Sequence, residues 1–317
     1  MYKKRTKTSV PLRSLTDFID AFDRHFSGST QLKCYRGQRD SSWQSVAGIL
    51  RPESKALLQD EKRAVRELMS VQPHEFAPDE TMFDKLVRMQ HFGLPTRLLD
   101  VTRNAMVALF FASDPGPVNC KPCDGLVTAF AIPPEVEKYY DSDSVSCIAN
   151  LANMTAEEKS GIFQLKESLT EDLSEDRTIE LFNNDEVVKR LLQFIRAEKS
   201  YFLPIMNPVD LFVPYYVHPK MSNRRILAQS GAFILYGIDP PEAMFSPYQI
   251  EKNPFIVPQD VKKSIREALH NIGINESTLF PEIDKAAARI KNSYPDGSAK
   301  AETRPTGALR RFFGMTR

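Results

Sequence analysis

The sequence of 317 residues contains no long uninterrupted apolar run, and this absence limits what the protein can be. A membrane-spanning helix needs about 20 predominantly apolar residues, so we expect no membrane partner. The first residues are basic, but no apolar stretch follows them, and we therefore expect no secretory signal. The four cysteines are too few and too scattered for a disulfide framework, which favours a reducing, cytoplasmic location.

An excess of charge of one sign is also missing. Lys and Arg together number 42, Asp and Glu together number 41, and the formal net charge is +1. Bulk charge therefore gives no argument for nucleic-acid binding, although it leaves room for a local basic patch. The 42% hydrophobic and 26% charged contents are those of a globular chain rather than of a disordered or coiled-coil one.

Several motifs that carry well-known chemistry are absent as well. The chain has no G-x-x-x-x-G-K-[ST], no G-x-G-x-x-G, no G-x-S-x-G and no H-E-x-x-H. Cys120 and Cys123 have the spacing of metal ligands, but no second pair follows them. Because a closed zinc site needs four ligands, we interpret the two as ordinary loop cysteines and predict no metal.

Apolar periodicity and turn residues predict the elements of the fold. Leu15, Phe18, Ile19 and Phe22 repeat at helical spacing, and Gly93 is suited to end a helix at the C′ position. Residues 104–113 are apolar on all sides, which is typical of a helix buried around its whole circumference. We expect further helices at 60–72, 79–92, 259–272 and 280–292 and strands at 31–38, 125–132, 211–217 and 232–238.

These elements do not alternate regularly enough for a doubly wound parallel sheet. We therefore expect an α+β fold, with a mixed or antiparallel sheet core, a buried central helix and a helical insertion. The expected organisation is a basic arm and N-terminal helix at 1–30, one principal domain at 31–292 and a flexible basic tail at 293–317. The insertion, at about 135–200, is charged and shows few core residues.

Three segments carry polar groups that chemistry could use. Residues 88–112 place many polar side chains between two apolar helices, either as helix caps with Arg97 paired to Asp100, or as the floor of a pocket. Arg36 precedes a glycine at a strand end, which suits a phosphate or carboxylate as well as an ordinary turn. Gln229 precedes Ser230-Gly231 where a strand begins, and either a ligand contact or a plain turn accounts for it.

The order and spacing of these segments, YRGQ, QHFGLPTRLLDVTRNAMVALFFA and NRRILAQSGAFILYG, resemble the FRG domain family. That family is named for its Phe/Tyr-Arg-Gly element, and its closing helix is similar to STLFPEIDKAAARIK here. Val101 departs from the tryptophan usual in the family. The residues that match the family motifs are Tyr35, Arg36, Gly37, Gln90, His91, Gly93, Pro95, Thr96, Arg97, Asp100, Thr102, Asn104, Arg225, Gln229, Gly231 and Phe233.

The resemblance implies a cytoplasmic effector in conflicts between bacteria and phages. We expect it to act on NAD as an enzyme similar to ADP-ribosyltransferases or as an NAD-hydrolysing enzyme. The predicted catalytic residues are Arg36, His91, Asp100 and Gln229. The predicted binding residues are Tyr35, Gly37, Gln90, Thr96, Arg97, Thr102, Asn104, Arg225, Gly231 and Phe233. Gln229 stands where such enzymes usually carry a glutamate, so either Asp100 supplies the negative charge or the chain binds without turnover.

Two other functions fit the same sequence. A nuclease-like effector would read phosphates with a set of arginines, namely Arg36, Arg39, Arg97, Arg103, Arg224 and Arg225. A sensor or adaptor without catalysis would bind a partner protein through residues 135–200. A nucleotide, a nucleic acid and a protein are thus the three partners that the sequence leaves open.

Overall fold

The computed structural model describes residues 12–118, 121–169, 173–221, 223–238 and 250–281, together with residues 287 and 291. The strands are β1 (Leu32–Gln38), β2 (Leu98–Thr102), β3 (Gly125–Ile132), β4 (Glu137–Tyr139), β5 (Tyr215–His218), β6 (Gly231–Leu235) and β7 (Glu251–Val257). The α-helices are α1 (Leu15–Phe26), α2 (Lys55–Gln59), α3 (Glu61–Val71), α4 (Pro73–Phe76), α5 (Met82–His91), α6 (Ala105–Ala112), α7 (Asp143–Ala149), α8 (Ala156–Ser168), α9 (Glu175–Asn184), α10 (Glu186–Glu198), α11 (Arg224–Ala228), α12 (Lys262–Asn271) and α13 (Glu276–Leu279). Short 3-10 turns lie at η1 (Gly48–Leu50), η2 (Pro52–Ser54), η3 (Pro134–Val136), η4 (Asn150–Asn153), η5 (Pro208–Leu211) and η6 (Gln259–Val261).

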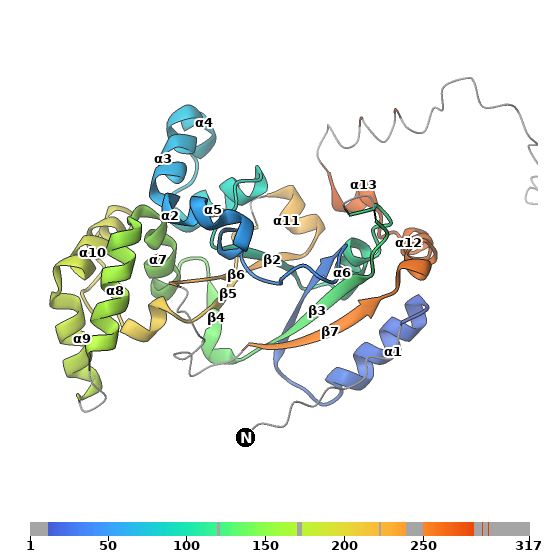
Figure 1. Ribbon diagram of the computed structural model, residues 1–317, viewed down its shortest axis with the longest axis horizontal. Helices are drawn as coiled ribbons and strands as arrows, with labels where there is room; N and C mark the ends of the chain where they lie inside the picture. Colours follow the sequence, from blue (N-terminus) through green and yellow to red (C-terminus); the bar gives the residue numbers. More distant parts are fainter. Residues whose placement is uncertain are drawn as a thin grey trace, which may run out of the picture.

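The strands form one seven-stranded sheet in the order β4-β5-β6-β2-β1-β3-β7. The pair β4 and β5 is parallel, and the other pairs of neighbours are antiparallel. Figure 1 shows helices on both sides of this sheet, with α7–α10 gathered beyond its β4–β5 end and α1 and α12 beside β7. The predicted α+β fold with a mixed sheet is therefore confirmed.

Two apolar cores lie on the two faces of the sheet. One contains buried residues of α5, α7, α8 and α10, packed against β2, β5 and β6. The other contains Phe18 of α1 and most of α6, packed with α12 against β1 and β3. Strand β3 contributes Phe130 to the first core and Val127 to the second, so it is buried on both faces, as its continuous apolar sequence predicts.

Helix α6 is the predicted central helix. Val107, Ala108 and Leu109 are at most 1% exposed, and the Asn104 side chain accepts a hydrogen bond from the Met106 backbone N–H at 2.9 Å. Phe111 is partly exposed, so α6 is buried on most of its circumference rather than all of it. Helix α5 ends at His91, and Gly93 follows at a φ of 92°, which confirms its predicted place at C′.

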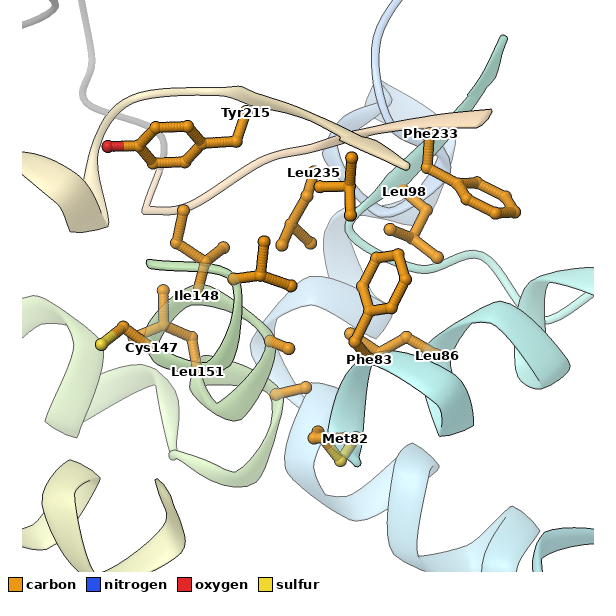
Figure 2. Close-up of a cluster of buried hydrophobic side chains, with 14 of the residues drawn as sticks. Met82, Phe83, Leu86, Leu98, Cys147, Ile148, Leu151, Tyr215, Phe233 and Leu235 are labelled. Atoms are coloured by element: carbon orange, nitrogen blue, oxygen red, sulfur yellow. The ribbon is translucent and has the colours of Figure 1, made fainter. Parts of the chain in front are cut away.

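The helices of residues 135–200 contribute to the main core rather than packing only with one another. Figure 2 shows Cys147, Ile148 and Leu151 in one apolar cluster with the sheet residues Tyr215 and Leu235. Few core residues are apparent from the sequence here, because charged residues are frequent among the apolar positions. Glu198 of α10 also accepts a hydrogen bond from the Met82 N–H at 2.7 Å, which ties this segment to the start of α5.

An ion cluster is buried between α3, β2 and α8. Glu61 Oε2 accepts hydrogen bonds from Arg97 Nη2 at 2.5 Å and from Lys159 Nζ at 2.7 Å. Arg97 Nη1 also donates to the Gly237 carbonyl at 2.7 Å. Burial raises the pKa of Glu61, but the two cations more than reverse this, and the pKa lies below its ordinary value. The carboxylate is therefore charged in the folded protein.

Some expected elements differ from the observed ones. The expected strand at 211–217 is shorter, because η5 precedes it and β5 begins after Pro214, which has no N–H for the ladder. The edge strand β7 was not predicted, because Pro254 and the charged Glu251 and Lys252 interrupt the apolar pattern that indicates a strand. The expected basic arm up to residue 11, most of the helix at 280–292 and the tail at 293–317 lie outside the described residues.

Candidate functional site

The sheet opens between β1 and β2. These strands pair at one position, Tyr35 opposite Thr102, whereas β1 pairs with β3 over its whole length. A cleft with a volume of about 430 Å³ lies here, between α5, α6 and α11. Its lining residues are Tyr35, Arg36, Gly37, Val87, Gln90, His91, Gly93, Asp100, Val101, Thr102, Val107, Phe111, Asn223, Arg225, Ile226, Gln229, Gly231, Ala232 and Phe233.

Arg36 reaches the cleft from the sheet face opposite α6. A Cβ on Gly37 would overlap the Ala108 carbonyl oxygen in α6, and alternation along β1 turns Arg36 the other way. Arg36 Nη1 donates to the Asp100 carbonyl at 2.8 Å and lies 3.9 Å from Asp100 Oδ2. Burial lowers the pKa of Arg36, and Asp100 opposes that shift. Its buried Nε has no hydrogen-bond partner among the described residues, so a donor remains for a ligand.

Gln90 of α5 fixes the Asp100 carboxylate. Its Nε2 donates to Asp100 Oδ2 at 2.9 Å. Its Oε1 accepts from the Thr96 hydroxyl at 3.0 Å and from the Thr96 N–H at 3.3 Å, which orients the amide. The Asp100 side chain is 57% exposed, so it remains accessible to a ligand while Gln90 and Arg36 hold its position.

The remaining wall comes from α11 and β6, and the segment that follows α12 supports it from behind. The Arg225 guanidinium lies over the Phe280 ring, 5.1 Å from its centroid, and Gln229 Nε2 donates to the Leu279 carbonyl at 3.0 Å. The Gln229 carbonyl accepts the Thr102 hydroxyl hydrogen bond at 2.6 Å. Gln229 is therefore held at both its amide and its backbone, and it joins this wall to β2.

Most predicted site residues line the cleft. They are Tyr35, Arg36, Gly37, Gln90, His91, Asp100, Thr102, Arg225, Gln229, Gly231 and Phe233. The sequence motifs that hold them lie far apart in the chain, so this convergence depends on the tertiary structure. Tyr35 also packs edge-on against Phe22 at 4.8 Å, and burial raises its pKa to about 12.

Three predicted binding residues lie elsewhere. Arg97 is 1% exposed and pairs with Glu61 on α3 rather than with Asp100, so it contacts no ligand in the cleft. It cannot belong to an exposed phosphate-reading surface either. Asn104 caps α6, and Thr96 acts behind Gln90. Each of these three polar side chains forms its hydrogen bonds with other groups of the protein.

Several lining residues were not predicted from the sequence. Asn223 caps α11 by accepting a hydrogen bond from the Arg225 N–H at 2.7 Å, and Phe111 adds an aromatic surface from α6. The asparagine before Arg224-Arg225 is a visible N-cap signal. Phe111 carries no such signal, because an apolar residue in an apolar helix does not reveal which face meets a cavity.

We predict that Gly37→Ala destabilises the protein by about 3 kcal/mol, because the added Cβ would overlap the α6 backbone. A helix backbone cannot move aside as a flexible side chain can. Urea unfolding measures this change. The matched control is Gly161→Ala in α8, where the nearest atom to a new Cβ is 3.7 Å away and no loss is expected. Equal stability of the two variants would contradict the prediction.

The described residues contain no group of three or more His, Cys, Asp or Glu side chains placed to hold a metal ion. Cys120, one of the two cysteines with ligand spacing, lies outside the described residues. Over the described ranges, no helix has the length and apolar character needed to cross a membrane.

Comparison with known proteins gives one family. The FRG domain model matches residues 31–116. Comparisons with curated proteins and with solved structures find no match. The matched residues include β1, α5, β2 and α6, and hence Arg36, Gln90 and Asp100, whereas α11 and β6 complete the cleft from outside the matched region.

Proposed function

We propose that this chain, which carries an FRG domain at residues 31–116, binds NAD in the cleft and cleaves the bond between nicotinamide and ribose. The product group, ADP-ribose, passes either to water or to an acceptor. The observation that supports this most is that Arg36 and Asp100 share the cleft, with Arg36 Nη1 3.9 Å from Asp100 Oδ2. A cation that binds phosphate and a carboxylate that stabilises positive charge thus stand side by side.

The charge of the cleft favours an anionic ligand. Arg36 and Arg225 both line it, and Asp100 is the single carboxylate among the lining residues that the structure describes. Arg36 Nε has no hydrogen-bond partner in that part of the chain, and a guanidinium binds phosphate oxygens in a forked geometry. In the proposal, Arg36 holds a phosphate or the nicotinamide ribose, and Tyr35 and His91 lie near the nicotinamide. A volume of about 430 Å³ lies within the range of small-ligand sites.

The proposed reaction breaks the bond between nicotinamide N1 and ribose C1′. The electron pair of that bond leaves with neutral nicotinamide, and the ribose develops an oxocarbenium-like positive charge. Water or an acceptor then forms the new bond to C1′ and releases a proton. Asp100, which Gln90 orients at 2.9 Å, would stabilise the positive ribose in place of the glutamate that Gln229 replaces.

We predict that Asp100→Asn lowers nicotinamide release by about 10²–10³-fold, because the amide cannot stabilise a developing positive charge. NAD affinity should change little, since Asp100 acts mainly on the charge that forms during the reaction. Chromatography of released nicotinamide and calorimetry of NAD binding measure the two effects separately.

The matched control is Asp23→Asn on the exposed surface of α1, which should retain full release. The proposal fails if the unaltered chain neither binds nor cleaves NAD, or if Asp100→Asn cleaves NAD at the unaltered rate. Release of nicotinamide without free ADP-ribose would indicate transfer to an acceptor, and equal amounts of both would indicate hydrolysis.

A further inference from the structure

A second cavity adjoins the cleft. This groove has a volume of about 550 Å³ and lies between α5 and residues 219–220 and 223–226. It shares four lining residues with the cleft, which are Val87, His91, Asn223 and Ile226. The two cavities are therefore neighbours that share these four side chains.

Most charges of the groove are already paired within the protein. Arg88 donates to both carboxylate oxygens of Asp79, at 2.6 and 2.8 Å. Lys220 lies 2.9 Å from Glu80 and 3.1 Å from Asp84. Among the lining residues, Arg88 and Lys220 balance Asp79 and Asp84, while Glu80, which does not line the groove, adds one negative charge beside Lys220.

Two lining residues of the groove are available to a ligand. Arg224 is exposed, and no ion pair or hydrogen bond joins its side chain to any other residue that the structure describes. Phe92 is 63% exposed, although a phenylalanine ring is ordinarily covered. An exposed aromatic ring and an unpaired guanidinium in one groove are the groups that bind a nucleobase and a phosphate.

Arg224 and Arg225 are successive residues at the start of α11, and each lines a different cavity. Arg224 lines the groove, and Arg225, whose guanidinium lies over the Phe280 ring, lines the cleft. A ligand that occupied both cavities would meet one guanidinium in each. A mononucleotide would occupy one of the two cavities, whereas a dinucleotide could place one nucleoside in each cavity.

From this arrangement we infer that the groove binds the second nucleoside of a dinucleotide, with its base against Phe92. This inference rests on the proposed function, because it assigns the nicotinamide half of NAD to the cleft and the adenosine half to the groove. The pyrophosphate then lies between Arg224 and Arg225. The substrate class is thus a dinucleotide pyrophosphate rather than a mononucleotide.

The test compares NAD with nicotinamide mononucleotide on the full chain, with calorimetry as the measurement. The unaltered chain should bind NAD more tightly than the mononucleotide. The double variant Phe92→Ala/Arg224→Gln should bind NAD about tenfold more weakly, because stacking and a phosphate contact are lost. Its affinity for the mononucleotide should not change. The matched control is Tyr201→Ala/Arg66→Gln, which removes an exposed aromatic and an exposed arginine far from the groove in the sequence.

The outcomes separate this inference from the proposed function. If NAD binds and the double variant binds it as tightly as the unaltered chain, the groove assignment is wrong while the cleft assignment stands. An equal loss for NAD and for the mononucleotide would also overturn the groove assignment. If neither ligand binds the unaltered chain, the proposed function is wrong, and the inference is wrong with it.

Discussion

Arg36→Ala is expected to weaken NAD binding by about a hundredfold, because it removes the charged donor from the cleft. The Arg36 side chain is 17% exposed, so little water competes with a phosphate for its guanidinium. Arg36→Lys should lose less, about tenfold, since it keeps the charge but not the forked geometry. Calorimetry with NAD measures both losses.

Folding must be checked for these variants, because Arg36 also joins the separated strands. Its Nη1 donates to the Asp100 carbonyl at 2.8 Å where β1 and β2 no longer pair. Circular dichroism and urea unfolding show whether each variant is folded under the binding conditions. Arg66→Ala, an exposed arginine on α3, is the matched control and should bind NAD normally. Normal NAD binding by folded Arg36→Ala would remove the arginine from the proposed site.

Arg97→Met is expected to lower the free energy of unfolding by about 3–5 kcal/mol, the range measured when one partner of a buried ion pair is removed. The side chains of Arg97 and Glu61 are each 2% exposed, so the remaining carboxylate has little access to water. Lys159 Nζ, at 2.7 Å, compensates part of the loss and places the expected value near the lower limit. Urea unfolding measures the change.

A triple variant separates the lost ion pair from the changed volume. Arg97→Met/Glu61→Leu would leave the buried Lys159 without its carboxylate partner, whereas Arg97→Met/Glu61→Leu/Lys159→Met removes all three charges and should be more stable than Arg97→Met alone. A loss below about 0.5 kcal/mol for Arg97→Met would contradict a buried structural role. NAD affinity of the folded Arg97→Met protein should match that of the unaltered chain, because Arg97 does not line the cleft.

The comparison of Arg36 with Arg97 shows how far the sequence could predict the site. Both arginines match motifs of the same family. Arg36 lies in β1 and Arg97 directly precedes β2, and the local sequence offers no sign of which one faces a cleft. The partner of Arg97 is Glu61, 36 positions away, and Lys159 reaches the same carboxylate from 98 positions away. Such pairs are set by the packing of helices against the sheet, which no local pattern encodes.

Local interactions account for what was predicted correctly. The starts and ends of α5 and α6 depend on caps at Thr81 and Asn104 and on Gly93, all within a few residues of the helices they limit. The strand β3 is recognisable because burial on both faces demands an unbroken apolar run. The polar set around Arg36 and Gln90 is likewise visible in the sequence, since those motifs are contiguous.

Long-range packing determined the rest. The opening between β1 and β2, the groove beside α5 and the contact of Arg225 with Phe280 each join segments that are distant in sequence. The near-zero net charge of +1 reveals none of this, because a total does not record where charges meet. Residue type and short-range spacing specify helices, caps and motifs. Which arginine faces the cleft and which is buried depends on sheet order and helix packing, because these set the distances between charges.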